Sequence, residues 1–247
     1  MSNQIHSSGG RTGGLTLSPR LAFLAGWVPQ GARLADIGTD HAYLPVWLDV
    51  HGRVNKAIAA DLRPGPLQRA RETGRLYGAC HVDYRLCDGL AAITEEECDT
   101  IVIAGMGGEN IAGILQRAPW TADGRHTLLL EPHSRAEVLR AFLAKNGYVI
   151  RREALVRDRG FLYPVMEVTG GEMTLSPGQI YCGAKLLHDP LGERYIIERI
   201  IQLQGVVAGK NKSADPNDRA HADQQRALIT ELLTMREEWR HANGTGN

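Results

Sequence analysis

The chain has 247 residues, and its 28 Lys and Arg side chains balance 28 Asp and Glu side chains, so the formal net charge is +0. Hydrophobic residues make up 43% of the chain, which is too apolar for an intrinsically disordered protein. The charge balance excludes a generally basic nucleic-acid binder, and the sequence has no run of about 18 apolar residues that would span a membrane as a helix. This length allows one large core and a smaller second unit.

The N-terminal segment, Met1 to Gly14, is polar and rich in glycine and serine. No apolar segment follows it, so we predict a flexible tail without a secretory signal and a cytoplasmic protein. The four cysteines include no C-x-x-C pair and have no histidine at zinc-finger spacing: Cys80, Cys87, Cys98 and Cys182. They are therefore expected to be reduced thiols, and no metal site is predicted.

From residue 33 to residue 168, short apolar runs alternate with helical patterns. Strands are predicted over 33–38, 56–61, 82–86, 100–104 and 127–130, and helices over 42–51, 65–78, 109–117 and 134–146. A closing antiparallel pair of strands is predicted over 148–156 and 161–168. Continuously apolar strands that alternate with helices are typical of a parallel sheet covered on both faces. The prediction is a doubly wound, Rossmann-like α/β sheet of seven strands, with its ligand at the carboxyl ends of the strands.

The pattern changes after residue 170, and from about Ser176 onward the strands stop. Two apolar sets then recur at the spacing of one helix face: Ile196, Ile200, Leu203 and Val207, followed by Leu228, Leu232, Met235 and Trp239. The polar segment Gly209 to Asp218 separates them. We therefore predict an antiparallel helical hairpin, and we divide the chain into a tail (1–14), an α/β domain (15–170) and a helical domain (171–247).

The first predicted strand ends in a turn that carries two acids. Asp36 and Asp40 flank Gly38, which permits a tight turn and a close approach between backbone and ligand. Phosphate groups bind backbone N–H groups away from anions, so these acids favour a cationic ligand such as S-adenosylmethionine, which carries an ammonium and a sulfonium group. The alternative role for Asp40 is to cap the following helix.

Two further acids end the second and third strands. Asp61 lies 25 positions after Asp36, where this fold places an acid on the hydroxyls of a ribose. Asp88, which precedes Gly89, is placed to accept a hydrogen bond from an adenine amine. The alternatives are a surface acid for Asp61 and an ordinary Asp-Gly turn for Asp88.

The fourth strand continues into a loop that contains Gly105, Gly107 and Gly108. Glycine is costly to order, so three glycines in four residues indicate a ligand close to the backbone, and a turn without a ligand is the alternative. This loop and the following Glu131 also imitate a dinucleotide fingerprint, which makes a nicotinamide-dependent oxidoreductase the rival prediction. Asn110 replaces the third glycine of that fingerprint, and the rival leaves the acids of the first three strands without a role.

Four segments carry a family resemblance: Asp36 to Pro45, Ala60 to Pro66, Cys87 to Leu90 and Ala104 to Gly108. In order and spacing they resemble the bacterial tRNA adenine-N1 methyltransferases of the TrmK type, which modify adenosine 22, and the agreement covers about residues 17–168. The resemblance implies a class I methyltransferase fold with S-adenosylmethionine as cofactor. The fifth strand departs from the family, because Leu130-Glu131-Pro132-His133 stands where the family usually has Leu-Gln-Pro-Asn.

The resemblance also implies roles for individual residues. It places the Asp36–His41 turn near the methionine end of the cofactor, Asp61 at the ribose and Asp88 near the adenine. The loop from Gly105 to Gly108 takes the place of the Asn-Pro-Pro-Tyr-like catalytic motif of related amino-methyltransferases. The implied cofactor-binding residues are Asp36, Gly38, Thr39, His41, Asp61, Leu62, Asp88, Gly89, Ala104 and Gly105.

The predicted reaction is an in-line displacement in which adenine N1 attacks the sulfonium methyl group, the bond between sulfur and methyl breaks, and S-adenosylhomocysteine leaves. N1 has no proton to lose, so no strong base is needed, and positioning supplies much of the rate. The product is a cation, which a nearby carboxylate stabilises. The target base must leave its stack, so Tyr43, Met106 and His133 are candidates for packing against it, with a core position as the alternative for Tyr43. The catalytic candidates are Asp40, Gly105, Met106, Gly107 and Glu131.

RNA binding needs a positive surface even at zero net charge. Two arginine clusters meet this need, one on a predicted helix (Arg63, Arg69, Arg71 and Arg75) and one at the closing hairpin (Arg151, Arg152, Arg157 and Arg159). Arginine suits phosphate contact, so the clusters predict a tRNA partner, whereas solvated surfaces are the alternative. Three other functions stay open: methylation of another RNA or a small molecule, nicotinamide-dependent oxidation, and cofactor binding without catalysis.

Overall fold

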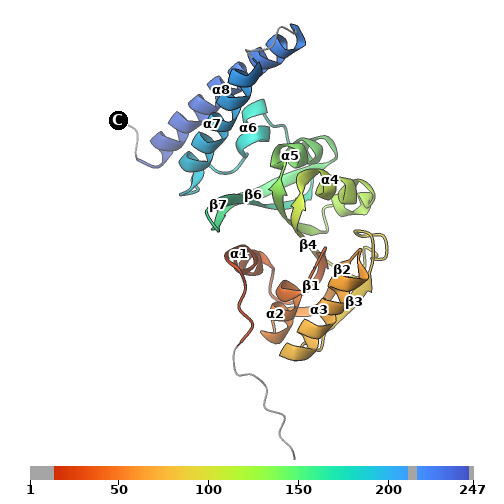
Figure 1. The fold of residues 1–247 in the computed structure, drawn as a ribbon. Coiled ribbons are helices and arrows are strands. Elements are labelled where there is room, and N and C mark those ends of the chain that lie inside the picture. The colour runs from red at the N-terminus through yellow and green to blue at the C-terminus, as the bar shows by residue number, and fades with distance from the viewer. Residues whose placement is uncertain (1–13, 211–215, 245–247) are drawn as a thin grey trace, which may run out of the picture.

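The computed structural model describes residues 14–210 and 216–244. Its centre is a seven-stranded sheet in the order β3-β2-β1-β4-β5-β7-β6 (Figure 1). The strands are β1 (Ala32–Ile37), β2 (Val54–Asp61), β3 (Val82–Leu86), β4 (Thr100–Gly107), β5 (Thr127–Ser134), β6 (Tyr148–Asp158) and β7 (Phe161–Gly170). The first five are parallel, and β7 lies antiparallel between β5 and β6. The predicted doubly wound sheet with an antiparallel last pair is therefore confirmed.

Helices cover both faces of this sheet. They are α1 (Pro19–Trp27), α2 (Tyr43–Val50), α3 (Pro64–Tyr77), α4 (Gly108–Gln116) and α5 (Ala136–Lys145). Helices α4 and α5 pack on the face that includes Ile101 and Ile103, whereas α1 and α2 pack on the opposite face with Val102. Because both faces are covered, a ligand reaches the sheet only at the ends of its strands.

The helix α1 is not predicted from the sequence, although its start signals are present. The hydroxyl of Ser18, the N-cap residue, accepts a hydrogen bond from the N–H of Leu21, and Pro19 opens the first turn. The helix has only nine residues, so its apolar pattern is too short to stand out. A short 3-10 helix, η1 (Pro119–Ala122), and the helix α6 (Pro177–Cys182) are further elements that the sequence does not predict.

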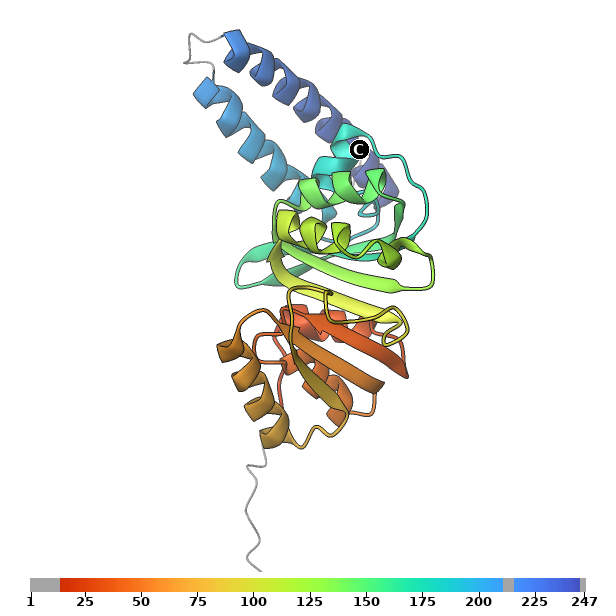
Figure 2. The same cartoon turned by 90° about the vertical axis from the view of Figure 1, so that its right-hand side faces the viewer.

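The predicted helical hairpin is formed by α7 (Gly192–Lys210) and α8 (Pro216–Ala242), which lie side by side (Figure 2). Glu193 at the start of α7 pairs with Arg236 near the end of α8, and Lys210 pairs with Asp218, so the helices are antiparallel. The ends of the predicted polar segment between them are helical, and residues 211–215 lie outside the described chain.

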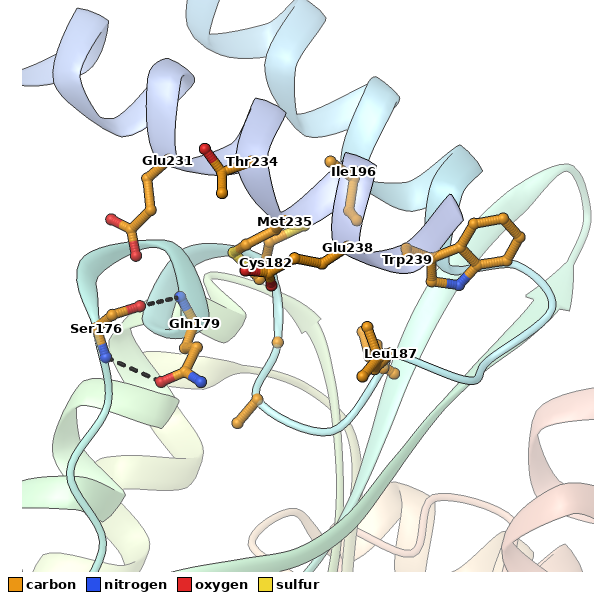
Figure 3. A pocket seen from close by; sticks show the side chains of 13 residues that line it. Ser176, Gln179, Cys182, Leu187, Ile196, Glu231, Thr234, Met235, Glu238 and Trp239 are labelled. Atoms are coloured by element: carbon orange, nitrogen blue, oxygen red, sulfur yellow. Dashed lines mark hydrogen bonds between the residues drawn. The ribbon is translucent and has the colours of Figure 1, made fainter. Parts of the chain in front are cut away.

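A cavity of about 340 Å³ lies between α6 and α8 (Figure 3). Ser176 and Gln179 close the N-terminus of α6 with reciprocal hydrogen bonds, and Ile196, Met235 and Trp239 give the cavity an apolar wall. It shares no lining residue with the cavities at the strand ends described below. The cavity therefore belongs to the helical part of the molecule.

Three observations bear on the tail, the cysteines and the membrane. The predicted tail falls on residues 1–13, outside the described chain, and Gly14 is exposed. All four cysteines are free thiols. Among residues 14–210 and 216–244, no cluster of three His, Cys, Asp or Glu side chains is arranged to hold a metal ion, and no helix is long and apolar enough to cross a membrane.

Candidate active site

The carboxyl end of β1 carries a buried acid. Asp36 is 6% exposed, and its carboxylate accepts a hydrogen bond from the hydroxyl of Thr39. Burial raises the pKa of Asp36 to about 6, although the Thr39 hydrogen bond opposes this change and nearby Asp61 adds to it. A buried acid of this kind at a cavity wall is stabilised in its charged form by a cationic partner.

The turn after β1 approaches the glycine loop of β4 closely. Gly38 has a φ of +73°, and a Cβ atom there would lie 2.1 Å from Cε of Met106. Asp40 also has a positive φ, and its carboxylate pairs with Arg69 of α3 at 3.1 Å. The alternative role of Asp40 as a helix cap is wrong, because Ala42 is the N-cap residue of α2 and no side chain caps it.

Asp61 at the end of β2 forms hydrogen bonds to the turn after β1 and to the turn after β2. It is 6% exposed, and its carboxylate accepts hydrogen bonds from the backbone N–H groups of Asp40 at 3.2 Å and of Arg63 at 2.9 Å. The alternative of a surface acid is therefore wrong. Asp61 is held in one position by the backbone on both sides, which is what a ligand-orienting carboxylate needs.

A cavity of about 570 Å³ opens along the ends of β1, β2 and β4. Nine of the predicted cofactor-binding and catalytic residues line it: Gly38, Asp40, Asp61, Leu62, Asp88, Gly89, Ala104, Gly105 and Met106. Asp88 pairs with Arg117 across its mouth at 3.0 Å, and both side chains are more than half exposed. Such an exposed pair contributes little free energy, so a ligand can replace Arg117 as the partner of Asp88.

A second cavity of about 160 Å³ adjoins the first and shares Gly38, Asp40, Ala104 and Gly105 with it. The remaining predicted cofactor residues, Asp36, Thr39 and His41, line this smaller cavity together with Tyr43. The rings of His41 and Tyr43 are stacked, with centroids 5.2 Å apart and planes 5° apart. All of the predicted cofactor residues therefore meet at one place, in two adjoining compartments.

The three glycines of the β4 loop have different roles. Gly105 has a φ of +79° and lines both cavities. A Cβ atom on Gly108 would lie 2.2 Å from the backbone oxygen of Arg135, and one on Gly107 would lie 3.3 Å from Oγ of Ser134. Gly107 lines neither cavity. The loop is thus glycine-rich partly for the left-handed backbone at Gly105 on the cavity walls and partly for close packing against the end of β5 and Arg135.

Glu131, the acid that departs from the family pattern, lies behind Gly105. Its side chain is fully buried, and Oε2 accepts a hydrogen bond from the N–H of Gly105 at 3.0 Å and pairs with Arg20 at 3.1 Å. Burial raises the pKa of Glu131 to about 7, against the opposing effects of Arg20 and Gly105. Glu131 lines neither cavity, and it contacts the cavity walls through the Gly105 N–H group and Arg20.

Arg20 is a site residue that the sequence pattern does not reveal. Its Nε donates a hydrogen bond to Asp158 at 2.9 Å, and its guanidinium group contacts Glu131 and His133 and lies 4.8 Å from the ring centroid of Tyr163. It also lines the smaller cavity. Glu131 and Asp158 lie 111 and 138 positions away in the sequence, so no local pattern could reveal this network.

All eight arginines of the two clusters are exposed, and they divide into members with and without a polar partner in the described chain. Arg69 pairs with Asp40, Arg71 donates to the carbonyl oxygen of Tyr84, Arg152 pairs with Glu167, and Arg63 lies 3.9 Å from Asp61. The other four are exposed, and their side chains have no ion pair within the chain that the structure describes: Arg75, Arg151, Arg157 and Arg159. These four are the members available to an external anion.

Comparisons with known proteins identify the family of the chain. Residues 17–166 match a family model described as a methyltransferase domain. The tRNA (adenine(22)-N(1))-methyltransferase of Bacillus subtilis is 36% identical over 177 residues, which are 71% of this chain and 74% of that protein. The crystal structure of the B. subtilis m1A22 tRNA methyltransferase TrmK has a TM-score of 0.75 at 29% identity, covering 92% of this chain and 99% of that chain.

A second solved structure includes the cofactor. It is a Streptococcus pneumoniae protein, described as a candidate tRNA (m1A22) methyltransferase, in complex with S-adenosyl-L-methionine. It has a TM-score of 0.77 at 31% identity and covers 88% of this chain and 100% of that chain. The chain therefore belongs to the methyltransferase-domain family and, within it, to the bacterial tRNA (adenine-N1)-methyltransferases of the TrmK type.

Proposed function

We propose that this protein transfers a methyl group from S-adenosylmethionine to N1 of adenosine 22 in tRNA, in the cytoplasm. The observation that carries the proposal is a pair of adjoining cavities at the ends of the strands. The buried acids Asp36 and Asp61 line these cavities together with the glycines Gly38 and Gly105. Buried carboxylates repel a nucleoside polyphosphate and attract a cationic cofactor. The family membership of the chain supports the same cofactor.

The larger cavity suits the nucleoside part of S-adenosylmethionine. We assign the fixed carboxylate of Asp61 to the ribose hydroxyls and Asp88 to the adenine amine, and the position of both on the lining of this cavity supports these roles. Gly38 leaves room for the side chain of Met106 at the cavity wall, and Gly105 lines the cavity without a side chain of its own. Asp36 lies on the side of the smaller cavity, where its charge would face the ammonium group of the methionine part.

We assign the part of the smaller cavity beside His41 and Tyr43 to the target adenine, next to the part beside Asp36 that takes the methionine end of the cofactor. The stacked rings of His41 and Tyr43 offer it a flat face, and Gly105 connects it to the cofactor cavity. S-adenosylmethionine, when bound, supplies the electrophilic sulfonium methyl group. These residues hold the base with N1 toward that group, and such positioning is worth about 7 kcal/mol or more of barrier. N1 carries no proton, so no side chain has to act as a base.

We assign Asp40 to the positive charge that develops on the adenine and give Glu131 a supporting role from outside the cavities. Asp40 lines both cavities, and its side chain is 56% exposed, so it is the candidate for direct contact. Glu131 lies outside the cavities and positions Gly105 by accepting a hydrogen bond from its N–H group. Met106 packs against the Gly38 turn at the wall of the larger cavity, and Gly107 begins the turn into α4. All four remain catalytic candidates, with positioning roles for Glu131 and Gly107.

The tRNA is bound by arginines on two elements. Arg75 on α3 and Arg151, Arg157 and Arg159 on the β6–β7 hairpin are exposed, so they are free to contact phosphates. Arginine binds phosphate with two parallel hydrogen bonds, which suits this role. Replacing them by alanine should weaken tRNA binding and reduce its dependence on salt concentration.

Methyl transfer into RNA tests the proposed function. Wild-type protein incubated with unmodified tRNA and methyl-labelled S-adenosylmethionine should place label in the tRNA, whereas Asp61→Asn should lose most of the transfer. Glu96→Gln, a change at an exposed acid away from both cavities, is the matched control and should behave as wild type. Absence of label in any tRNA, together with thermal stabilisation by NAD alone, would favour the rival oxidoreductase.

A further inference from the structure

An exposed aromatic side chain sits at the tip of the β6–β7 hairpin. Phe161 is 66% exposed, although a side chain of this kind is normally buried. Arg157 and Arg159, on the same tip, are exposed and have no ion pair within the described chain. An exposed apolar ring on the same hairpin tip as two unpaired cations is unusual on a surface that contacts only water, and it suits a partner that is both flat and anionic.

The ring of Phe161 begins a line of aromatic groups that leads to the smaller cavity. Its centroid lies 6.5 Å from that of Tyr163, and the Tyr163 ring lies 5.2 Å from His133. The guanidinium carbon of Arg20 lies 4.8 Å from the Tyr163 centroid, and Arg20 lines the cavity assigned to the target adenine. The tip is therefore connected to the wall of that cavity by direct contacts.

The tip is held in place from below. Asp158 is 8% exposed and pairs with Arg20, which joins the hairpin to α1. Arg159 and Gly160 form the turn, both with positive φ, of 47° and 89°. The two turn residues project Phe161 into solvent, and the Asp158–Arg20 pair fixes the hairpin below it. A nucleobase that stacks on Phe161 therefore meets a preformed surface.

We infer that Phe161, with Tyr163 beneath it, is a stacking site for a nucleobase that flanks the target adenosine in the RNA substrate. Unpaired RNA bases stack on exposed aromatic rings, and nearby arginines bind the phosphates between them. A base held there would keep the strand at the mouth of the cavity while the target adenine is turned into it. The inference rests on the proposed function, because it assumes an RNA substrate.

The test compares Phe161→Leu with a matched control, Leu76→Ala on α3, whose leucine is also 66% exposed. Phe161→Leu should raise the KM for tRNA on the order of tenfold, with kcat and the Kd for S-adenosylmethionine nearly unchanged. Phe161→Trp should retain the wild-type KM, since it keeps a ring for stacking. Equal KM values for Phe161→Leu and Leu76→Ala would overturn the inference, and so would a loss of cofactor affinity in Phe161→Leu.

Binding of fluorescently labelled tRNA separates this inference from the proposed function. If wild-type protein binds tRNA and Phe161→Leu binds it about tenfold more weakly, the stacking site stands even when no methyl group is transferred. If wild-type protein methylates tRNA and Phe161→Leu binds and methylates it normally, the proposed function stands and the stacking site is wrong.

Discussion

Two acidic residues of the site have carboxyl groups that are buried in the protein. Asp36 and Glu131 are both buried, and burial raises their pKa values to about 6 and about 7. Asp36 lines a cavity and can meet a ligand, whereas Glu131 is covered by Gly105. Both carboxyl groups therefore change charge between pH 4 and 8. Only the charge of Asp36 lies at a cavity wall, where it can change the affinity for a cofactor.

Cofactor binding should depend on the charge of Asp36. Its pKa is about 6, so S-adenosylmethionine should bind more weakly as the pH falls below 6, by up to about tenfold for each pH unit, because the protonated acid no longer attracts the ammonium group. Calorimetric titration between pH 5 and 8 measures this dependence. Asp36→Asn should bind weakly at every pH, and an equally steep profile in that variant would show that another group is responsible.

The stability of the protein should depend on the charge of Glu131. Its pKa is raised from 4.5 to about 7, so between these values the native state holds the proton more tightly than the unfolded chain does. The stability from this group is therefore full below pH 4.5 and is lost as the pH rises through 7. Glu131→Gln, which restores the usual residue of the family, should flatten the free energy of unfolding over this range in urea titrations. An unchanged slope would contradict the raised pKa.

Arg20 should stabilise the fold mainly by neutralising Glu131. Arg20→Ala leaves the fully buried carboxylate without its 3.1 Å partner, so the free energy of unfolding should fall by about 2 kcal/mol at pH 8. The double variant Arg20→Ala with Glu131→Gln should recover part of this loss. If the loss of unfolding free energy in the double variant equals the sum of the losses in the two single variants, Arg20 and Glu131 are not coupled.

The site could be predicted from the sequence where its residues belong to local motifs. Asp36, Asp61 and Asp88 each lie at or just after the end of a predicted strand. The fold brings the carboxyl ends of these three strands to one edge of the sheet. The contact between Arg20 and Glu131 could not be predicted, because it joins segments 111 positions apart and needs the position of α1.

At the scale of elements, the predicted strand centres agree with the structure, but β4 and β5 extend further than expected. Their pairing continues past Ala104 through a register shift, with Met106 opposite Pro132. The glycines and the proline there interrupt an apolar pattern, so the sequence suggests that the strands stop earlier. The added length carries the glycine loop to the cavity edge.

A buried ion pair joins the sheet to the segment that leads into the helical hairpin. Arg140 of α5 and Glu153 of β6 are fully buried as side chains and lie 2.7 Å apart. Arg140 also donates to the backbone oxygen of Ile180, and Glu153 accepts hydrogen bonds from the N–H groups of Ala184 and Lys185. The pair thus holds three segments that lie far apart in the sequence.

Glu153→Gln should therefore destabilise the protein strongly. It leaves the Arg140 charge buried without its counterion, and the free energy of unfolding should fall by about 3 kcal/mol. Glu167→Gln is the matched control, because it breaks an ion pair with Arg152 whose arginine is 49% exposed, and it should cost less than about 1 kcal/mol. Similar losses for the two variants in chemical denaturation would contradict this assignment.

Across the whole molecule, a net charge of zero conceals a separation of charges. Acids gather at the two cavities, and exposed arginines gather on α3 and on the β6–β7 hairpin. The helical hairpin extends beyond the sheet (Figure 1), yet Leu155 and Leu162 of the sheet share a buried cluster with Ile200 and Leu232 of α7 and α8. The predicted domain division at residues 170 and 171 therefore crosses a continuous apolar contact.

The most direct measurement is the position of the transferred methyl group. An unmodified tRNA with adenosine at position 22 should gain one methyl group at N1 of that nucleotide, as mapped by nuclease digestion and mass spectrometry. The same tRNA with guanosine at position 22 should gain none. A methyl group at another nucleotide, or equal transfer to both tRNAs, would contradict the proposed function.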